Sequence, residues 1–222
     1  GATASGLRAT PCVTLVSDTG WVAASVANFW QNFPKALRRR NDALEIGLFP
    51  SESTAGFELQ GGEQKRHTIL LDFGQGDRPQ TVSDLQRPVA VRVDAAWVEA
   101  SDAIPWFCAR MQGDDGAYDG YVRQIVEGPN AFAAKREIID EYGWRHFGEI
   151  YADHEAVNRP LISHYNNQYD AIAGMASRFM QTGDARWWSA MCELAAHVTD
   201  IDLYRATGDR AAAHGGHKRL RE

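Results

Sequence analysis

The chain has 222 residues, of which 44% are hydrophobic and 23% charged, the composition of a soluble globular protein with one or two buried cores. The formal net charge is −6, so the sequence carries no electrostatic footprint for binding nucleic acid or an anionic membrane. No apolar run approaches the roughly 18 residues of a membrane span. The three cysteines, Cys12, Cys108 and Cys192, are far apart and support neither a disulfide framework nor a zinc site.

Residues 1–112 are predicted to form an antiparallel β-sandwich domain. Short apolar or alternating runs recur there, separated by Gly, Pro, Asn and Asp, which favours a sandwich over βαβ units. The candidate strands are 13–16, 21–29, 44–49, 57–60, 64–73 and 89–93. The basic run Arg38-Arg39-Arg40 is interpreted as a solvated face.

A polar, turn-rich segment at 112–116 marks the expected domain boundary. After it the period of the apolar residues changes from two to about 3.6, so residues 113–222 are predicted to be mostly helical. Pro129 suits the first turn of a helix that continues through 135–142, and Gly143 follows its expected end.

The clearest predicted helices form a pair at 165–181 and 185–203. Gly183 is placed to end the first helix, and Asp184 is placed to cap the second. So short a break forces an antiparallel hairpin, the unit from which α/α toroids are built. Two apolar stripes are interpreted as core: Tyr165, Tyr169, Ile172, Ala176 and Phe179, and then Trp187, Met191, Leu194, Val198 and Ile201.

The segment 143–169 is unusually dense in hydrogen-bonding and proton-transfer groups. Its polar members include His146, Glu149, Asp153, His154, Glu155, His164, Asn166 and Asn167. Buried polar groups cost roughly 1–3 kcal/mol when left unpaired, so they are normally kept out of a core. Aromatic faces beside Asn, His and acids also suit a sugar-binding cleft. We therefore interpret this segment as the wall of an active site.

Four segments resemble the exo-rhamnogalacturonan lyase-like family of polysaccharide lyases. They are WQNFPK at 30–35, FELQGGEQK at 57–65, DEYGWR at 140–145 and SHYNNQYD at 163–170. The resemblance covers about residues 21–216. It implies an α+β chain in which a β-sandwich is followed by the first helices of an (α/α) toroid. In the family a further β domain precedes the sandwich.

The family pattern also implies more toroid helices than this sequence holds, so we expect the chain to be a fragment. Little or no turnover is expected from it alone, and apolar stripes without toroid neighbours would favour self-association. The expected partner is an acidic polysaccharide or oligosaccharide, with no nucleic acid and no membrane. The compartment is open, with a secreted or periplasmic location favoured over the cytoplasm.

The resemblance implies cleavage of a uronic-acid polysaccharide by β-elimination, and that reaction sets the residue types. Hydrogen-bond donors or a cation neutralise the uronate carboxylate, a base removes the C5 proton, and an acid protonates the departing oxygen. His164 and Tyr169 are assigned to proton transfer, and Asn166 or Asn167 to the carboxylate. The full set of candidate catalytic residues is His164, Tyr169, Asn166, Asn167, His154 and Arg145.

Five further residues are candidates for substrate binding: Tyr165, Trp144, His146, Lys65 and Lys35. No metal site and no cofactor is predicted, although calcium stays open. Structural alternatives compete with these roles. Asn166 can cap a helix, Tyr169 can pack in a core, and Arg145 with His146 and His154 can brace a loop.

Two other functions stay open beside the lyase. A glycoside hydrolase on the same toroid would use two carboxylates about 5–10 Å apart, such as Asp153 with Glu155, or Asp170. A non-catalytic carbohydrate-binding module would use the sandwich and its aromatic side chains only to hold sugar. Product analysis separates the three functions.

Overall fold

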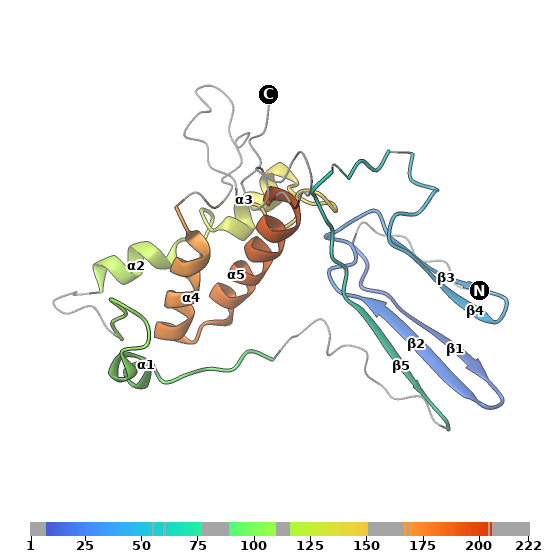
Figure 1. The fold of residues 1–222 in the computed structure, drawn as a ribbon, viewed down its shortest axis with the longest axis horizontal. Helices are drawn as coiled ribbons and strands as arrows, with labels where there is room; N and C mark the ends of the chain where they lie inside the picture. The colour runs from blue at the N-terminus through green and yellow to red at the C-terminus, as the bar shows by residue number, and fades with distance from the viewer. Residues whose placement is uncertain are drawn as a thin grey trace. The chain divides into compact units, whose positions relative to one another are not determined.

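The computed structural model describes residues 8–54, 56–59, 61–76, 89–109, 116–150, 167, 169–203 and 205. The chain divides into two compact units. The sheet unit comprises Gly1–Val89 with Tyr142–Phe147, and the helical unit comprises Ala90–Glu141 with Gly148–Glu222. All strands of the described residues lie in the first and all helices in the second, so the fold is α+β (Figure 1). The predicted boundary at 112/113 falls outside the described residues.

The larger sheet has the strand order β1-β2-β5 and is antiparallel throughout. Its strands are β1 (Cys12–Ser17), β2 (Gly20–Val26) and β5 (Ile69–Gly74). The central strand β2 is buried along most of its length, and Trp21 and Ala23 pack with Leu70 in the core of this unit. The predicted strands at 13–16, 21–29 and 64–73 are confirmed in position, although the last two are shorter than predicted.

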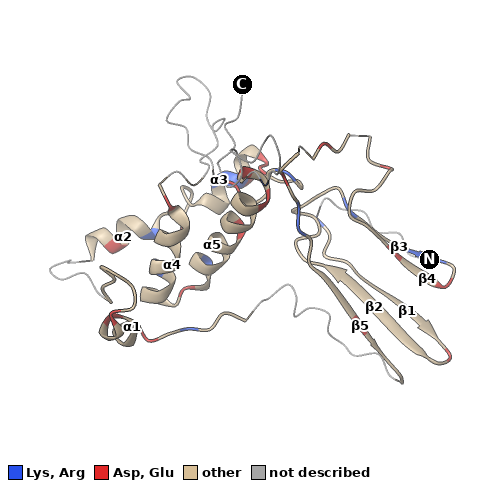
Figure 2. Ribbon diagram, viewed as in Figure 1, with Lys and Arg blue, Asp and Glu red and all other residues tan. Residues whose placement is uncertain are grey.

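A separate two-stranded sheet joins β3 (Ala36–Arg40) to β4 (Ala43–Gly47). The predicted strand at 44–49 is confirmed as β4, while the basic run Arg38–Arg40 belongs to a strand that the sequence did not predict. Arg38 stands opposite Glu45 in the register and pairs with it, which offsets the charge of this run. Acidic and basic residues are interspersed along the described chain (Figure 2).

Two predicted strands are wrong. Residues 57–59 and 89–93 lie outside any strand, and helix α1 (Ala95–Ser101) occupies part of the region predicted as β. The Asp94 side chain accepts a hydrogen bond from the Trp97 N–H and so caps α1, a local signal that the β interpretation overlooked. Phe57 packs on Phe49 instead of joining a ladder, with ring centroids 5.1 Å apart.

The remaining helices are α2 (Ala117–Arg123), α3 (Phe132–Ile139), α4 (Ala171–Thr182), α5 (Ala185–His197) and a π-helix (Val198–Asp202). The predicted hairpin is confirmed: Gly183 is left-handed with φ 65°, and the Asp184 side chain accepts a hydrogen bond from the Arg186 N–H. Helix α4 begins at Ala171 instead of 165, because Asp170 caps it. Helix α3 ends at Ile139 with Asp140 as its C-cap, before the predicted Gly143.

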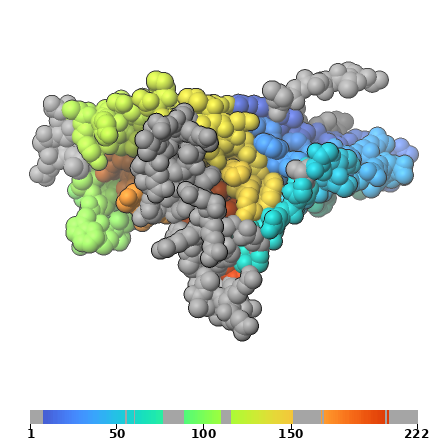
Figure 3. Space-filling view, turned by 90° about the horizontal axis from the view of Figure 1, so that it is seen from above, coloured from blue at the N-terminus to red at the C-terminus, as the bar shows by residue number. Residues whose placement is uncertain are grey.

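The core of the helical unit lies between α4 and α5. It consists of Ile150, Met175, Phe179, Trp187, Leu194 and Val198. Residues 116–141 (yellow-green to yellow) form part of the face of this unit seen in Figure 3. Phe179 and Trp187, which the fragment hypothesis left partly uncovered, are buried. Self-association stays a prediction. No described helix is long and apolar enough to cross a membrane.

Candidate functional site

The sheet unit contains a pocket of about 490 Å³ beside the segment Tyr142–Phe147. Its lining residues are Phe33, Pro34, Gly56, Phe57, Glu58, Tyr142, Gly143, Trp144, Arg145 and His146. Two backbone hydrogen bonds fix the segment in this unit: Gly143 N–H donates to Gln31 C=O at 2.7 Å, and Trp144 N–H donates to Phe33 C=O at 2.8 Å. The predicted residues Trp144, Arg145 and His146 are thereby brought into one pocket.

Arg145 is held in place by three contacts. Its Nη1 donates to Glu58 C=O at 2.9 Å, and its Nη2 donates to Glu63 Oε1 at 2.7 Å. Its guanidinium carbon also lies 5.5 Å from the centroid of the Trp144 ring. The Trp144 ring packs edge-on against Phe49, with centroids 5.3 Å apart. This pocket therefore combines fixed aromatic faces with an oriented cation.

Lys35 and Lys65 lie in the same unit, where their positive charges repel each other. Burial, and then the positive charge of Lys65, lower the pKa of Lys35 from 10.5 to about 8. The Lys35 Nζ donates to Asn32 C=O at 2.8 Å, and neither lysine is among the residues that line the pocket. A lysine with this pKa is partly neutral in mildly alkaline solution and can accept a proton.

Asn167 and Tyr169 belong to the helical unit and precede helix α4. The Asn167 Oδ1 accepts a hydrogen bond from Ile172 N–H at 3.3 Å, and its backbone is left-handed with φ 50°. Tyr169 has 79% of its surface exposed, so the predicted packing of Tyr169 in the helix stripe is wrong. Four other candidates, His154, His164, Tyr165 and Asn166, lie outside the described residues.

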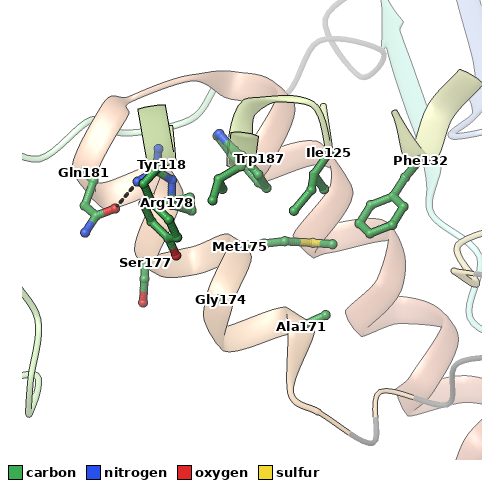
Figure 4. Close-up of a pocket in the computed structure, with 11 residues that line it drawn as sticks. Tyr118, Ile125, Phe132, Ala171, Gly174, Met175, Ser177, Arg178, Gln181 and Trp187 are labelled. Carbon is green, nitrogen blue, oxygen red and sulfur yellow. Dashed lines mark hydrogen bonds between the residues drawn. The ribbon is translucent and has the colours of Figure 1, made fainter. Parts of the chain in front are cut away.

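The helical unit holds a largely apolar cavity of about 390 Å³ (Figure 4). Ile125, Phe132 and Met175 point toward the same space. The Arg178 Nη1 at its edge donates to Gln181 Oε1 at 2.9 Å, and its Nη2 is paired with Asp119 at 2.8 Å. Among the described residues that line this cavity, none is a His, Asp or Glu, so it offers little for proton transfer.

A buried polar cluster in the helical unit joins Glu149 to the C-terminal end of α5. The His197 Nε2 lies 3.1 Å from Glu149 Oε2 and 3.6 Å from Asp202 Oδ1. All three residues are buried, and one ligand atom from each lies within 4.8 Å of the others. These residues could hold a metal ion. Burial alone lowers the pKa of His197, but hydrogen bonds and charges of Asp202 and Glu149 outweigh it and raise the pKa to about 9.

The sequence analysis missed His197 and Asp202 for a geometric reason. Residues five apart on an α-helix point about 140° away from each other, so this pair carries no helical signal. The π-helix changes this, because Leu203 N–H bonds back to Val198 C=O five residues earlier. A wider turn of this kind brings residues i and i+5 onto one face. Such turns are frequent at functional sites.

Gly148 allows Glu149 to reach α5. Its φ is 104°, and a Cβ atom there would overlap the Glu193 backbone carbonyl and lie 3.1 Å from the His197 Cβ. Only glycine adopts this backbone conformation without strain and leaves room for the helix. The close approach of the two backbones therefore depends on the absence of a side chain at position 148.

Comparison with known proteins adds no assignment. No family model matches the chain, and a search of the curated proteins finds no significant match.

Proposed function

We propose that this chain is part of a polysaccharide lyase that cleaves a uronic-acid-containing, rhamnogalacturonan-like polysaccharide by β-elimination. The supporting observation is the pocket of the sheet unit, where Arg145 lies beside the half-buried aromatic rings of Phe57 and Trp144. The resemblance of segments 30–35, 57–65, 140–145 and 163–170 to the exo-rhamnogalacturonan lyase-like family supports the same proposal. In this reading the chain carries a β-sandwich and the start of an (α/α) toroid.

The pocket suits a sugar that carries a carboxylate. Aromatic rings such as Phe57 and Trp144 stack on the apolar face of a pyranose, and the guanidinium of Arg145 attracts the uronate. Neutralising the carboxylate stabilises the enolate that forms when the C5 proton leaves. Lys35 is a candidate for the base that removes this proton, because a fraction of its amine is neutral near pH 8.

The remaining catalytic assignments rest on the segment 163–170. His164 and Tyr169 are proposed to transfer protons, and Asn166 or Asn167 to hold the carboxylate. For Asn167 the structure favours a competing role, since its Oδ1 already accepts a hydrogen bond from the start of helix α4. Asn166 is therefore the stronger candidate of the two for the carboxylate.

A carbohydrate-binding module is the second candidate function. It is favoured by the contacts of Arg145, whose two terminal nitrogens both donate to groups of the protein itself. A cation held in this way can brace the pocket and bind sugar without taking part in chemistry. The hydrolase is less well supported, because Asp170, one of its proposed carboxylates, caps helix α4 through Oδ1.

The test measures binding and products with galacturonate–rhamnose oligosaccharides. Titration calorimetry should detect binding to the chain, and Trp144→Ala should weaken it roughly tenfold, the loss of about 1.4 kcal/mol. The control Trp97→Ala changes an exposed tryptophan of the helical unit and should leave binding unchanged. Product analysis uses a longer protein that contains this chain. If that protein is a lyase, it should release an unsaturated uronate that absorbs in the far ultraviolet.

Each result decides between the functions. The lyase is supported if an unsaturated product forms. The role of Lys35 is supported if Lys35→Met abolishes this product but still binds the oligosaccharide. New reducing ends without unsaturated product indicate a hydrolase. Binding without any product indicates a binding module, and the absence of binding overturns the assignment of the pocket.

A further inference from the structure

We propose that Glu149, His197 and Asp202 form a binding site for a divalent first-row transition cation of the Zn²⁺ class. This site lies within the helical unit and is independent of the pocket assigned to saccharide. It would join the segment at Gly148–Ile150 to the π-helix at the end of α5.

The distances of the two carboxylates from His197 fit a coordination sphere. Zn²⁺ binds histidine nitrogen and carboxylate oxygen at about 2.0–2.2 Å, so two ligand atoms at a tetrahedral angle lie about 3.3–3.6 Å apart. The His197 Nε2 is 3.1 Å from the Glu149 oxygen and 3.6 Å from the Asp202 oxygen. Both carboxylates thus face the same nitrogen at separations near those of a shared ion.

A proton on His197 Nε2 does not account for two carboxylates facing the same nitrogen. The Nε2 atom of a histidine carries one hydrogen, which can point at only one of two carboxylates at a time. The two carboxylates together carry a charge of −2. With a neutral imidazole and a divalent ion, the net charge is zero. Buried charges are normally paired, so the ion is the better match.

Two buried atoms without a hydrogen-bond partner also favour a bound ion. The Asp202 Oδ2 and the His197 Nδ1 are buried and have no hydrogen-bond partner among the described residues. An unpaired N–H costs more on a charged imidazolium than on a neutral ring. Metal binding at Nε2 keeps the ring neutral and gives the Asp202 carboxylate a cation to bind. Glu149 is oriented for this role, because its Oε1 accepts from the Ile150 N–H while Oε2 faces His197.

The donor set selects the ion. One imidazole nitrogen with two carboxylate oxygens suits Zn²⁺ and its neighbours, whereas Ca²⁺ requires six to eight oxygen ligands. Three protein ligands leave a fourth position for water, as in zinc sites that are not closed. Calcium is therefore the comparison ion in the test.

The test uses the full chain without an affinity tag, with His214→Ala and His217→Ala already introduced, since these C-terminal histidines could bind metal themselves. After dialysis against a chelator, titration with ZnCl₂ should show about one Zn²⁺ per chain and a raised melting temperature. Asp202→Asn should weaken Zn²⁺ binding more than about 100-fold, beyond the 10–100-fold typical of outer-shell partners. The control Glu193→Gln, another acid of α5, should bind as the parent does.

A second measurement needs no variant of the cluster and so covers the case in which Asp202→Asn fails to fold. X-ray absorption of the Zn²⁺-loaded parent should show one imidazole with oxygen ligands and no sulfur. The proposal is overturned if the parent binds no Zn²⁺, if binding survives Asp202→Asn, if only Ca²⁺ binds, or if the spectrum shows cysteine sulfur or several imidazoles.

Discussion

The Nη2 atom of Arg145 lies 2.7 Å from Oε1 of Glu63, although 82 positions separate the two residues in the chain. The Glu63 side chain is fully buried, while a quarter of the Arg145 side chain is exposed. This pair ties the segment Tyr142–Phe147 to the residues of the sheet unit. It also orients the guanidinium at the pocket that we assign to substrate.

Removing Arg145 should therefore destabilise the sheet unit. Arg145→Ala leaves the buried carboxylate of Glu63 without its guanidinium, and the expected loss is about 3 kcal/mol in the free energy of unfolding. Urea denaturation at neutral pH measures it. In a cycle of Arg145→Met and Glu63→Gln, the double variant should lose less than the sum of the two single variants, because it removes both charges of the pair together. Additive losses would show that the two residues act independently.

The stability contributed by Lys35 should depend on pH. Its pKa is about 8 in the folded protein against 10.5 for an unperturbed lysine, so the unfolded chain binds more protons between these values. Stability therefore rises as pH increases from about 8 to 10.5, and the full cost of burying the charge is present below pH 8. Urea denaturation measures the free energy of unfolding of the parent and of Lys35→Met. As pH rises from about 8 to 10.5, the parent should gain stability relative to Lys35→Met.

Chemical labelling tests the same pKa directly. At pH 8 about half of the Lys35 amines should be neutral, against roughly 1% or less for an ordinary lysine, so acylation followed by mass spectrometry should modify Lys35 early. Lys65→Gln removes one cause of the lowered pKa and should slow the labelling. Burial, the larger cause, remains, so the pKa should return only part of the way. Unchanged labelling would mean that Lys65 does not act on Lys35.

Asp184 should stabilise helix α5 by capping it. Asp184→Ala removes the hydrogen bond from Arg186 N–H and should cost about 1 kcal/mol, whereas Asp184→Asn keeps a capping oxygen and should cost less. Hydrogen bonding from the Arg186 side chain lowers the pKa of Asp184. The charge of Asp184 therefore stabilises the folded protein above the pKa of the unfolded chain, near 3.8. This stabilisation is lost as pH falls through the lower pKa of the folded protein. The difference in melting temperature between the parent and Asp184→Asn should shrink in acid, whereas Asp184→Ala should stay below Asp184→Asn, because its missing cap does not depend on pH.

Gly148 should tolerate no side chain. Gly148→Ala forces a Cβ into the Glu193 carbonyl at a φ of 104°, and we expect a loss of at least about 2 kcal/mol. The matched control is Gly120→Ala in α2, where no atom lies within 4 Å and the change should stabilise the protein by about 0.4–1 kcal/mol. Thermal unfolding compares them, and equal effects would contradict the close approach at Gly148.

The sequence by itself determined the elements whose signals are local. The hairpin of α4 and α5 follows from two apolar stripes with Gly183 and Asp184 between them, because left-handed backbone and capping depend on neighbouring residues. Strands β1, β2 and β4 follow from short apolar runs that turn residues separate. The same rules failed at α1, where the capping residue Asp94 was read as part of a strand region.

Tertiary structure decided which distant residues meet. Nothing local links Glu63 to Arg145, and the return of Tyr142–Phe147 to the sheet unit depends on backbone hydrogen bonds to Gln31 and Phe33. The cluster at His197 depends on a π-turn and on a glycine at a contact between backbones, and neither leaves a periodic signal in the sequence. Periodicity reports the face that a helix or strand buries, whereas the partner on that face is chosen by packing across the whole chain.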